Sequence, residues 1–333
     1  MLKKILKAKP YIVAEIGANH NGNFKKAIQL IKKAKLAGCD AVKFQSWDEK
    51  LNCKEYYDKN PNILKDFLKY KLDFIQLRKL RTFSKKINID FGTSPFTFKQ
   101  IKDAIKLNCD FIKIASMDLN NYPFIEKISK LKKNVIISTG FSSSKEILKV
   151  CKILKKNKKK NVIFLHCIGL YPPPNENHIN LNNIKMLKKS TGYESGFSDH
   201  TIWKETPLAA SALGAVVIEK HFTLNKKAKG WDHSVSADFK EMKELVLSAK
   251  RVFKLPGKFE RNLSKSELKN SKIMRRSITS KKKIFKEKKI TLKEIDFQRP
   301  GIGLSPENIN RIIGRKAKKN IDIGKILKLK DFK

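Results

Sequence analysis

Two lysines lie inside short apolar segments of the chain, where an unpaired ammonium group is unfavourable. They are Lys43, in residues 39–45, and Lys113, in residues 111–116. Hydroxyl side chains stand at the ends of several apolar segments: Thr93, Ser94, Ser116, Ser138, Thr139 and Ser198. Lysine supplies a point charge to an anion, and hydroxyls supply directed hydrogen-bond donors. If these segments converge, the residue types predict a site for a small phosphorylated or carboxylated molecule.

Two histidines, His200 and His221, each close a further apolar segment, and Glu15 stands near the end of the first one. Imidazole together with carboxylate suits zinc, manganese or iron, whereas oxygen-rich sites suit magnesium. These three residues predict a divalent-metal site that leaves room for water or a substrate oxygen.

Some of the polar residues have purely structural alternatives. Thr93 and Ser138 are equally well explained as caps of the helices that follow them. His166 is flanked by apolar residues, which also fits a hydrogen-bonded core histidine. His178 lies in a loop rich in Pro and Asn, and this composition predicts a surface position.

Eight short apolar segments can position these side chains. They are residues 11–17, 39–45, 90–96, 111–116, 134–140, 162–169, 193–200 and 216–223. Most are dense in Val, Ile and Phe, as buried parallel strands are. Lys-rich amphipathic stretches separate them, such as 24–37, which Gly38 ends. Eight strand–helix units over about 250 residues predict a (β/α)8 TIM barrel, whose catalytic residues come from the carboxyl ends of the strands.

A doubly wound open sheet is the alternative fold. A nucleotide-binding sheet of that type carries a GxGxxG turn after its first strand, whereas this chain has EIGANHNG there. The barrel is therefore the better prediction for residues 1–254. The connection 46–89 is longer than the others and is expected to hold one extra helix.

The remainder of the chain differs in composition from the barrel. Residues 255–272 are polar, which predicts a linker. Residues 273–333 contain short β-like runs with turn signals, which predict a small β-rich domain.

The 333 residues carry 74 Lys and Arg against 31 Asp and Glu, a formal net charge of +43. Only nine of the basic residues are Arg, and the lysines are spread along the chain. Because Arg is the residue that reads bases, this pattern predicts a solvated lysine surface rather than a nucleic-acid partner. No apolar run approaches the roughly 20 residues that cross a bilayer, so no membrane association is expected.

The five cysteines have no metal-knuckle or redox spacing, and the N-terminus lacks the features of a signal peptide. We therefore expect free thiols and a cytoplasmic location.

The motifs at the segment ends are EIGANHNG, AVKFQ, FGTSPF, KIAS, ISTG, LHC, GFSDHT, EKHFT and KGWDHSVS. Together they resemble the N-acetylneuraminate (sialic acid) synthase family, which includes the legionaminic and pseudaminic acid synthases. RRSI and QRPGIGLSPENI, near the C-terminus, resemble the antifreeze-like (SAF) domain of that family, a small β-clip fold. The resemblance covers residues 11–331.

This resemblance implies condensation of phosphoenolpyruvate with an open-chain N-acylated hexosamine, foremost N-acetylmannosamine, and water, with release of phosphate. It implies Mn²⁺ or Mg²⁺ as the divalent metal, and a domain-swapped homodimer in which the small domain of one chain covers the barrel of the other.

Carried over position by position, the resemblance implies metal binding by His200 and His221 and an acid/base role for Glu15. The phosphoenolpyruvate-binding residues become Lys43, Ser94, Lys113, Ser116, Ser138 and Ser198. The sugar-binding residues become Gln45, Asp118, Tyr171, Asp232 and Arg299.

Three positions depart from the family pattern: Asp118 where Glu is frequent, Gly169 where Asn or Ser is common, and Lys220 where Arg is usual. They leave the choice of sugar open. A legionaminate or pseudaminate synthase acting on a 2,4-diacetamido-trideoxyhexose is the main alternative.

Two more distant alternatives remain. Another phosphoenolpyruvate-dependent aldol synthase would not explain the C-terminal domain. A non-catalytic sugar- or nucleic-acid-binding protein would be expected to lose the histidines or lysines. For Arg299, a structural pairing with Glu294 or Asp296 is the alternative to substrate binding.

Overall fold

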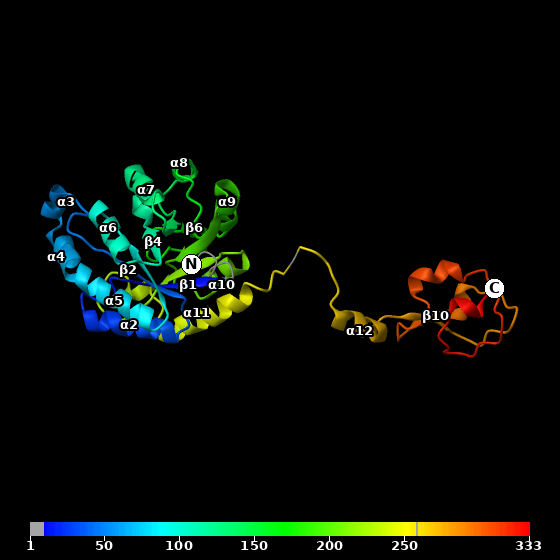
Figure 1. The fold of residues 1–333 in the computed structure, drawn as a ribbon. Coiled ribbons are helices and arrows are strands. Elements are labelled where there is room, and N and C mark those ends of the chain that lie inside the picture. The colour runs from blue at the N-terminus through cyan, green and yellow to red at the C-terminus, as the bar shows by residue number, and fades with distance from the viewer. Residues whose placement is uncertain (1–9, 258) are drawn as a thin grey trace. The chain divides into compact units, whose positions relative to one another are not determined.

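The computed structural model describes residues 10–257 and 259–333. Its contacts divide the chain into two compact units, with the boundary after Gly257. The first unit contains a closed barrel of eight parallel strands in chain order, and Figure 1 shows helices around its outside. This confirms the predicted (β/α)8 barrel.

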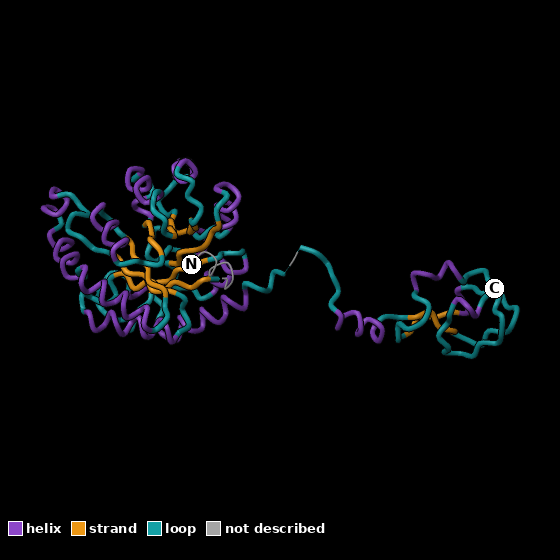
Figure 2. The backbone as a smooth tube through the Cα atoms, in the orientation of Figure 1, coloured by secondary structure: helices purple, strands orange, loops and turns teal. Residues whose placement is uncertain are grey.

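The strands are β1 (Tyr11–Gly17), β2 (Ala41–Gln45), β3 (Asp90–Ser94), β4 (Phe111–Ile114), β5 (Asn134–Ser138), β6 (Val162–Cys167), β7 (Glu194–Asp199) and β8 (Val217–His221). All residues of β1, β4, β6 and β8 are buried, which explains their continuous apolar sequences. Figure 2 shows the strands surrounded by helices.

One helix of the outer ring follows each strand. These helices are α2 (Phe24–Leu36), α5 (Phe74–Lys86), α6 (Phe98–Lys106), α7 (Tyr122–Ser129), α8 (Ser144–Lys156), α9 (Asn182–Thr191), α10 (Glu205–Ala212) and α11 (Phe239–Val252). In α2, Ala27, Leu30, Ile31 and Ala34 are buried at helical spacing, so one stripe packs on the barrel. Reciprocal capping boxes start α5, α6, α8 and α11.

The long connection between β2 and β3 holds two extra helices, α3 (Lys54–Lys59) and α4 (Pro61–Tyr70), before α5. The expectation of one extra helix was therefore wrong. Asn60 has a non-helical conformation, and Pro61 opens α4, where its missing N–H costs nothing. These residues divide this part of the connection into two short helices.

The second unit is mostly loop (Figure 2). It contains helix α12 (Lys265–Met274) and the antiparallel strands β9 (Ser277–Ser280) and β10 (Ile295–Gln298). Its core is a separate apolar cluster that includes Ile278, Ile290 and Phe332. The range 255–272, expected to be a linker, contains most of α12, and no residue of this helix is buried.

Across residues 10–257 and 259–333, none of the helices combines the length and the apolar character that crossing a lipid bilayer requires.

A buried carboxylate, Glu294, organises the start of β10. The Thr291 backbone N–H donates to Glu294 Oε2 at 2.9 Å, and Lys282 Nζ lies 3.1 Å from Oε1. The Thr291 hydrogen bonds and the Lys282 charge lower the pKa of Glu294 to about 2. A depressed carboxyl pKa stabilises the folded state above the unfolded value of about 4.3, and this stabilisation is lost as the pH falls toward 2.

We therefore expect Glu294→Gln to lower the free energy of unfolding of the second unit at pH 7 by about 1–3 kcal/mol. The difference from wild type should shrink between pH 4 and pH 2. The free energy of unfolding of the second unit is measured by isoleucine methyl NMR of the full chain during a urea titration. The signals of Ile278 and Ile290, in the core of this unit, report its unfolding. Glu287→Gln is the matched control, because Glu287 is exposed and its ion pairs contribute little. Equal effects of the two substitutions at pH 7 would contradict the role of Glu294.

Candidate active site

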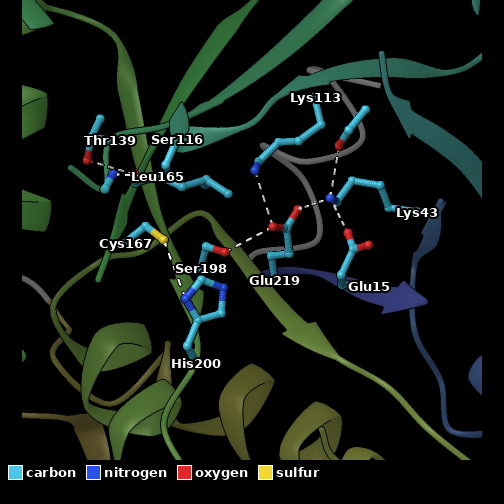
Figure 3. Close-up of polar contacts among 12 residues, drawn as sticks. Glu15, Lys43, Lys113, Ser116, Thr139, Leu165, Cys167, Ser198, His200 and Glu219 are labelled. Atoms are coloured by element: carbon cyan, nitrogen blue, oxygen red, sulfur yellow. Dashed lines mark hydrogen bonds and ion pairs between the residues drawn. The ribbon is translucent and has the colours of Figure 1, made fainter. Parts of the chain in front are cut away.

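Four buried charged side chains meet at the carboxyl end of the barrel (Figure 3). Lys43 forms an ion pair with Glu15, and its Nζ lies 3.7 Å from Glu219 Oε2. Lys113 Nζ lies 3.3 Å from Glu219 Oε1, which also accepts a hydrogen bond of 2.9 Å from Ser198 Oγ. All four charged side chains are at most 5% exposed. Each ammonium group therefore has a carboxylate partner inside the barrel.

Strand register brings these residues together. Glu15 of β1 lies opposite Lys43 of β2 on one side and His221 of β8 on the other. Ser198 of β7 lies opposite Glu219 of β8. Because side chains alternate along a strand, Glu219 and His221 share one face of β8.

Burial and charge act in opposite directions on this group. Burial raises the pKa of Glu15 despite the nearby Lys43 ammonium. Burial acts in the same sense on Glu219, but the charges of Lys113 and Lys43 outweigh it and lower its pKa. Burial also lowers the pKa of Lys113. Glu219 is accordingly the carboxylate that stays ionised between the two lysines.

The predicted hydroxyl residues surround the two lysines. Lys43 Nζ donates to Ser94 Oγ at 3.2 Å, and the Gly140 backbone N–H donates to Ser116 Oγ at 3.1 Å. Ser138 Oγ is buried and has no hydrogen-bond partner among the described residues. A Cβ atom at Gly140 would lie 2.8 Å from Ser116 Oγ, so only glycine permits this close approach. The structure thus gathers these hydroxyls at one end of the barrel.

The helix-cap alternative for Thr93 and Ser138 was wrong. The caps of the following helices are Thr97 for α6 and Ser143 for α8. The Thr93 hydroxyl instead lies 2.9 Å from the Ser46 hydroxyl.

The two predicted metal-binding histidines lie together beside this group. The ring centroids of His200 and His221 are 5.5 Å apart, and the Tyr171 ring stacks on His200 at 3.8 Å. His200 Nδ1 donates to the Ile168 carbonyl oxygen at 2.7 Å, which leaves Nε2 free as a ligand atom. His221 Nδ1 is buried without a hydrogen-bond partner in the described structure and lies 3.6 Å from Asp232 Oδ2.

The sequence led us to expect that Glu15 joins the two histidines in a metal site, and in the structure it does not. It pairs with Lys43 instead. Within the described ranges, no group of three or more His, Cys, Asp or Glu side chains is arranged to hold a metal ion. The described part of the protein therefore supplies two imidazole groups, those of His200 and His221, as candidate metal ligands.

Three of the polar residues converge on Gly17. A Cβ atom there would lie 3.1 Å from Gln45 Oε1 and Glu15 Oε1 and 3.2 Å from Asp232 Oδ2. Gly17 also has a φ of 51°, in the left-handed region that glycine adopts without the steric cost of a Cβ atom. Gly17 therefore leaves space in which oxygen atoms from β1, β2 and the loop after β8 face each other.

Asp118 and Arg299 occupy different surroundings. Asp118 follows β4, is buried, and burial raises its pKa to about 6. Arg299 belongs to the second unit and is exposed. Its alternative partners are engaged elsewhere, Glu294 with Lys282 and Asp296 with backbone and side-chain groups of its own strand. The structural pairing of Arg299 with Glu294 or Asp296, which was the alternative to substrate binding, is therefore not formed among the described residues.

Glu219 is a member of the buried charged group to which sequence reasoning assigned no role. The signal was present, because two buried lysines need anionic partners and Glu219 stands two residues before His221 on a buried strand. His166 is a core histidine, with Nε2 2.6 Å from the Ile179 carbonyl oxygen, and His178 is exposed.

The structure is a (β/α)8 barrel with a buried group of two lysines and two carboxylates and an imidazole pair at the carboxyl ends of its strands. The sequence profile of the NeuB family matches residues 30–261. The chain belongs to the NeuB family.

Characterised relatives extend this result over nearly the whole chain. N,N'-diacetyllegionaminic acid synthase of Campylobacter jejuni is 37% identical, over 94% of this chain and 97% of that protein. A pseudaminic acid synthase of the same species is 34% identical, over 98% and 97%. The crystal structure of the sialic acid synthetase of Leptospira borgpetersenii, in complex with citrate, superposes with a TM-score of 0.73 at 32% identity, over 79% of this chain and 90% of that one.

Removal of Lys43 tests the buried charge group. Lys43→Met leaves Glu15 without its cation inside the barrel, and loss of one partner of a buried pair costs about 3–5 kcal/mol. We expect this loss in the free energy of unfolding, measured by tryptophan fluorescence in urea, since all three tryptophans lie in the first unit.

Lys59→Met is the matched control. Lys59 pairs with Glu55 at 2.8 Å on the surface of α3, where an ion pair contributes at most about 1 kcal/mol. A Lys43→Met protein as stable as this control would contradict the dependence of the barrel on the buried pair.

Proposed function

We propose that this protein condenses phosphoenolpyruvate with the open-chain aldehyde of an N-acylated hexosamine and water, and releases phosphate. The observation that carries this proposal is the buried group of Lys43, Lys113 and Glu219, ringed by serines, in a chain of the NeuB family. The legionaminic and pseudaminic acid synthases among the relatives support the same class of product, a nonulosonic acid.

Phosphoenolpyruvate binds at the two lysines in this proposal. Lys43 and Lys113 face the charge of the phosphate and carboxylate, and the hydroxyls of Ser94, Ser116, Ser138 and Ser198 supply directed donors. The unpartnered Ser138 hydroxyl supports this role, because a buried hydroxyl without a partner is unfavourable unless a ligand satisfies it.

The acceptor sugar lies on the side of Gln45, Asp118, Tyr171 and Asp232. Carbon three of the enol phosphate attacks the aldehyde carbon, and the positive charge that develops at carbon two is trapped by water. The resulting tetrahedral intermediate expels phosphate. Glu15 passes the proton of the water or of the new hydroxyl, since its carboxylate lies beside both Lys43 and the oxygen atoms around Gly17.

His200 and His221 would hold the divalent metal, Mn²⁺ or Mg²⁺. They fit this role because His221 Nδ1 is a buried nitrogen without a hydrogen-bond partner in the described residues and His200 Nδ1 is bound to a backbone carbonyl. Burial lowers the pKa of His221, which favours the neutral imidazole that ligates metals. The bound metal would supply Lewis-acid polarisation of the aldehyde oxygen.

The second unit acts as an antifreeze-like domain in this proposal. It covers the barrel mouth of a second copy in a domain-swapped homodimer, and Arg299 binds the N-acyl group of the sugar there. The exposure of Arg299 and the absence of an intramolecular partner for it in the described chain support this role. The free cysteines and the metabolic substrate fit a cytoplasmic reaction.

Phosphate release tests the reaction directly. The purified full-length protein with phosphoenolpyruvate, Mn²⁺ and an acceptor sugar should release one phosphate for each nonulosonic acid formed. His221→Ala should abolish turnover and metal binding without unfolding the barrel, whereas His178→Ala, at an exposed position, should leave both unchanged. Full activity of His221→Ala, or of wild type after exhaustive chelation, would contradict the metal site.

Subunit mixing tests the swapped site. Arg299→Ala and His221→Ala proteins should each be inactive or severely impaired as homodimers. Their mixture should regain part of the activity, because a heterodimer contains one site with both native residues. Phosphate release after verified subunit exchange measures this recovery, and its absence would indicate a site built within one chain.

A further inference from the structure

A further buried ion pair, separate from the charged group, joins the ends of β7 and β8. Lys220 Nζ lies 3.0 Å from Asp199 Oδ2, and the two side chains are 8% and 0% exposed. Asp199 directly precedes His200, and Lys220 directly precedes His221. The pair is therefore next in the chain to both proposed metal ligands, and neither member has a role in the proposed reaction.

The ion pair lies on the outer face of the barrel wall. Asp199 of β7 is opposite Lys220 of β8, and two residues earlier Phe197 is opposite Ile218. Phe197 and Ile218 belong to the apolar cluster that also contains residues of α10 and α11. Because residues two apart share one face of a strand, Asp199 and Lys220 also point toward the helices. They face away from the charged group inside the barrel.

Lys220 also binds the backbone that follows β7. Its ammonium group donates a hydrogen bond to the carbonyl oxygen of Thr201. The Thr201 backbone N–H in turn donates to Asp199 Oδ1 at 2.9 Å. Asp199 and Thr201 are the two chain neighbours of His200, and both contact Lys220. His200 is thus the middle residue of a short segment that Lys220 holds at both ends.

The strand ladder alone does not hold His200 in place. The pairing of β7 with β8 ends at Asp199 and Lys220, so His200 lies beyond the last paired residue. His221, in contrast, is still part of β8 and lies opposite Glu15 of β1. The contacts of Lys220 therefore extend the connection between the two strands past the end of their ladder, to the point where His200 begins its approach to His221.

The ring of His200 and its backbone are held by different groups. The hydrogen bond from Nδ1 to the Ile168 carbonyl oxygen orients the ring. The Asp199–Lys220 pair and the Thr201 carbonyl fix the backbone from which the ring projects. Two imidazoles bind one cation well only at the separation that its coordination geometry requires, so the backbone position matters as much as the orientation of the ring.

We propose that Asp199 and Lys220 are positioning residues that set the separation of His200 and His221, and thereby the affinity of these histidines for a divalent cation. This inference rests on the metal role that the proposed function gives to the two histidines. Lys220 does not touch the cation and acts through the backbone on either side of His200. Loss of groups that support metal ligands lowers metal affinity about 10- to 100-fold.

The surroundings of the pair provide a conservative variant. A cavity of about 60 Å³ lies beside it, with Asp199, Thr201, Trp203 and Lys220 in its lining. The longer side chain of Lys220→Arg has room there to keep its charge beside Asp199 and to donate to the Thr201 carbonyl oxygen. Lys220→Met, in contrast, keeps an unbranched side chain but removes both the charge and the donors.

Titration of the full-length protein with Mn²⁺ alone tests the proposal without any turnover. The electron paramagnetic resonance signal of free Mn²⁺ measures the affinity. Lys220→Met should weaken Mn²⁺ binding about 10- to 100-fold, and Lys220→Arg should regain most of this loss. Tryptophan fluorescence in urea establishes that each variant is folded under the conditions of the titration.

A double variant separates positioning from the cost of an unpaired buried charge. Lys220→Met leaves the Asp199 carboxylate without a cation, which could unfold the barrel. Asp199→Asn combined with Lys220→Met removes both charges, and the asparagine oxygen still accepts from the Thr201 N–H. Mn²⁺ binding should remain weak in this double variant, because the Thr201 carbonyl oxygen has lost its donor.

Lys250→Met is the matched control. Lys250 Nζ also lies 3.0 Å from a carboxylate oxygen, Asp40 Oδ2, but Asp40 directly precedes β2 and so lies at the amino ends of the strands. Its Mn²⁺ affinity should equal that of wild type. Wild-type affinity in the folded double variant, or equal losses in Lys220→Arg and Lys220→Met, would overturn the inference.

The same measurements distinguish this inference from the proposed function. Wild-type protein that binds no Mn²⁺ would contradict the metal role of the histidines and this inference together. Unchanged Mn²⁺ affinity in the variants of Lys220, with phosphate release by wild type, would overturn the inference and leave the synthase function standing. The expected losses of Mn²⁺ affinity without phosphate release by wild type would contradict the synthase reaction and support the positioning role.

Discussion

The central constraint on this molecule is the presence of two ammonium groups inside an apolar barrel. Lys43 and Lys113 are nearly inaccessible to water, and an isolated buried charge costs far more than a domain's net stability can absorb. Glu15 and Glu219 offset this cost. Because all four come from the ends of β1, β2, β4 and β8, the site exists only when the barrel is closed. Closure of the barrel is therefore a condition for the pairing of these buried charges.

In the proposed function, the same group is prepared for an anion before one arrives. The lysines are held by carboxylates and hydroxyls in fixed positions, so little reorganisation is needed on binding. The imidazole pair lies next to Glu15 across the β1–β8 seam, and Tyr171 stacks on one ring. The two lysines, Glu15 and the proposed metal site thus lie at the same end of the barrel.

An aromatic cavity, lined in part by Trp47, Phe67 and Trp231, is built from other elements than the charged group and the imidazole pair. The lysines, serines and histidines come from the strands or directly follow them, whereas the aromatic cavity depends on the two extra helices between β2 and β3 and on loops after β2, β4 and β8. Loops tolerate substitution better than barrel strands do. The relatives include synthases of two different products, legionaminic acid and pseudaminic acid.

The sequence by itself determined the eight strands, the barrel and most of the polar residues at its mouth, because dense Val, Ile and Phe segments and their polar ends are local features. The tertiary structure alone decided which of those residues are partners. It paired Glu15 with Lys43 rather than with the histidines, gave Glu219 its place between the lysines, and split the long connection at Asn60. It also assembled the cavity from Trp47, Met117 and Trp231, which lie far apart in the chain. Such pairings depend on strand register and barrel closure, which bring distant side chains within a few ångströms and which no local pattern encodes.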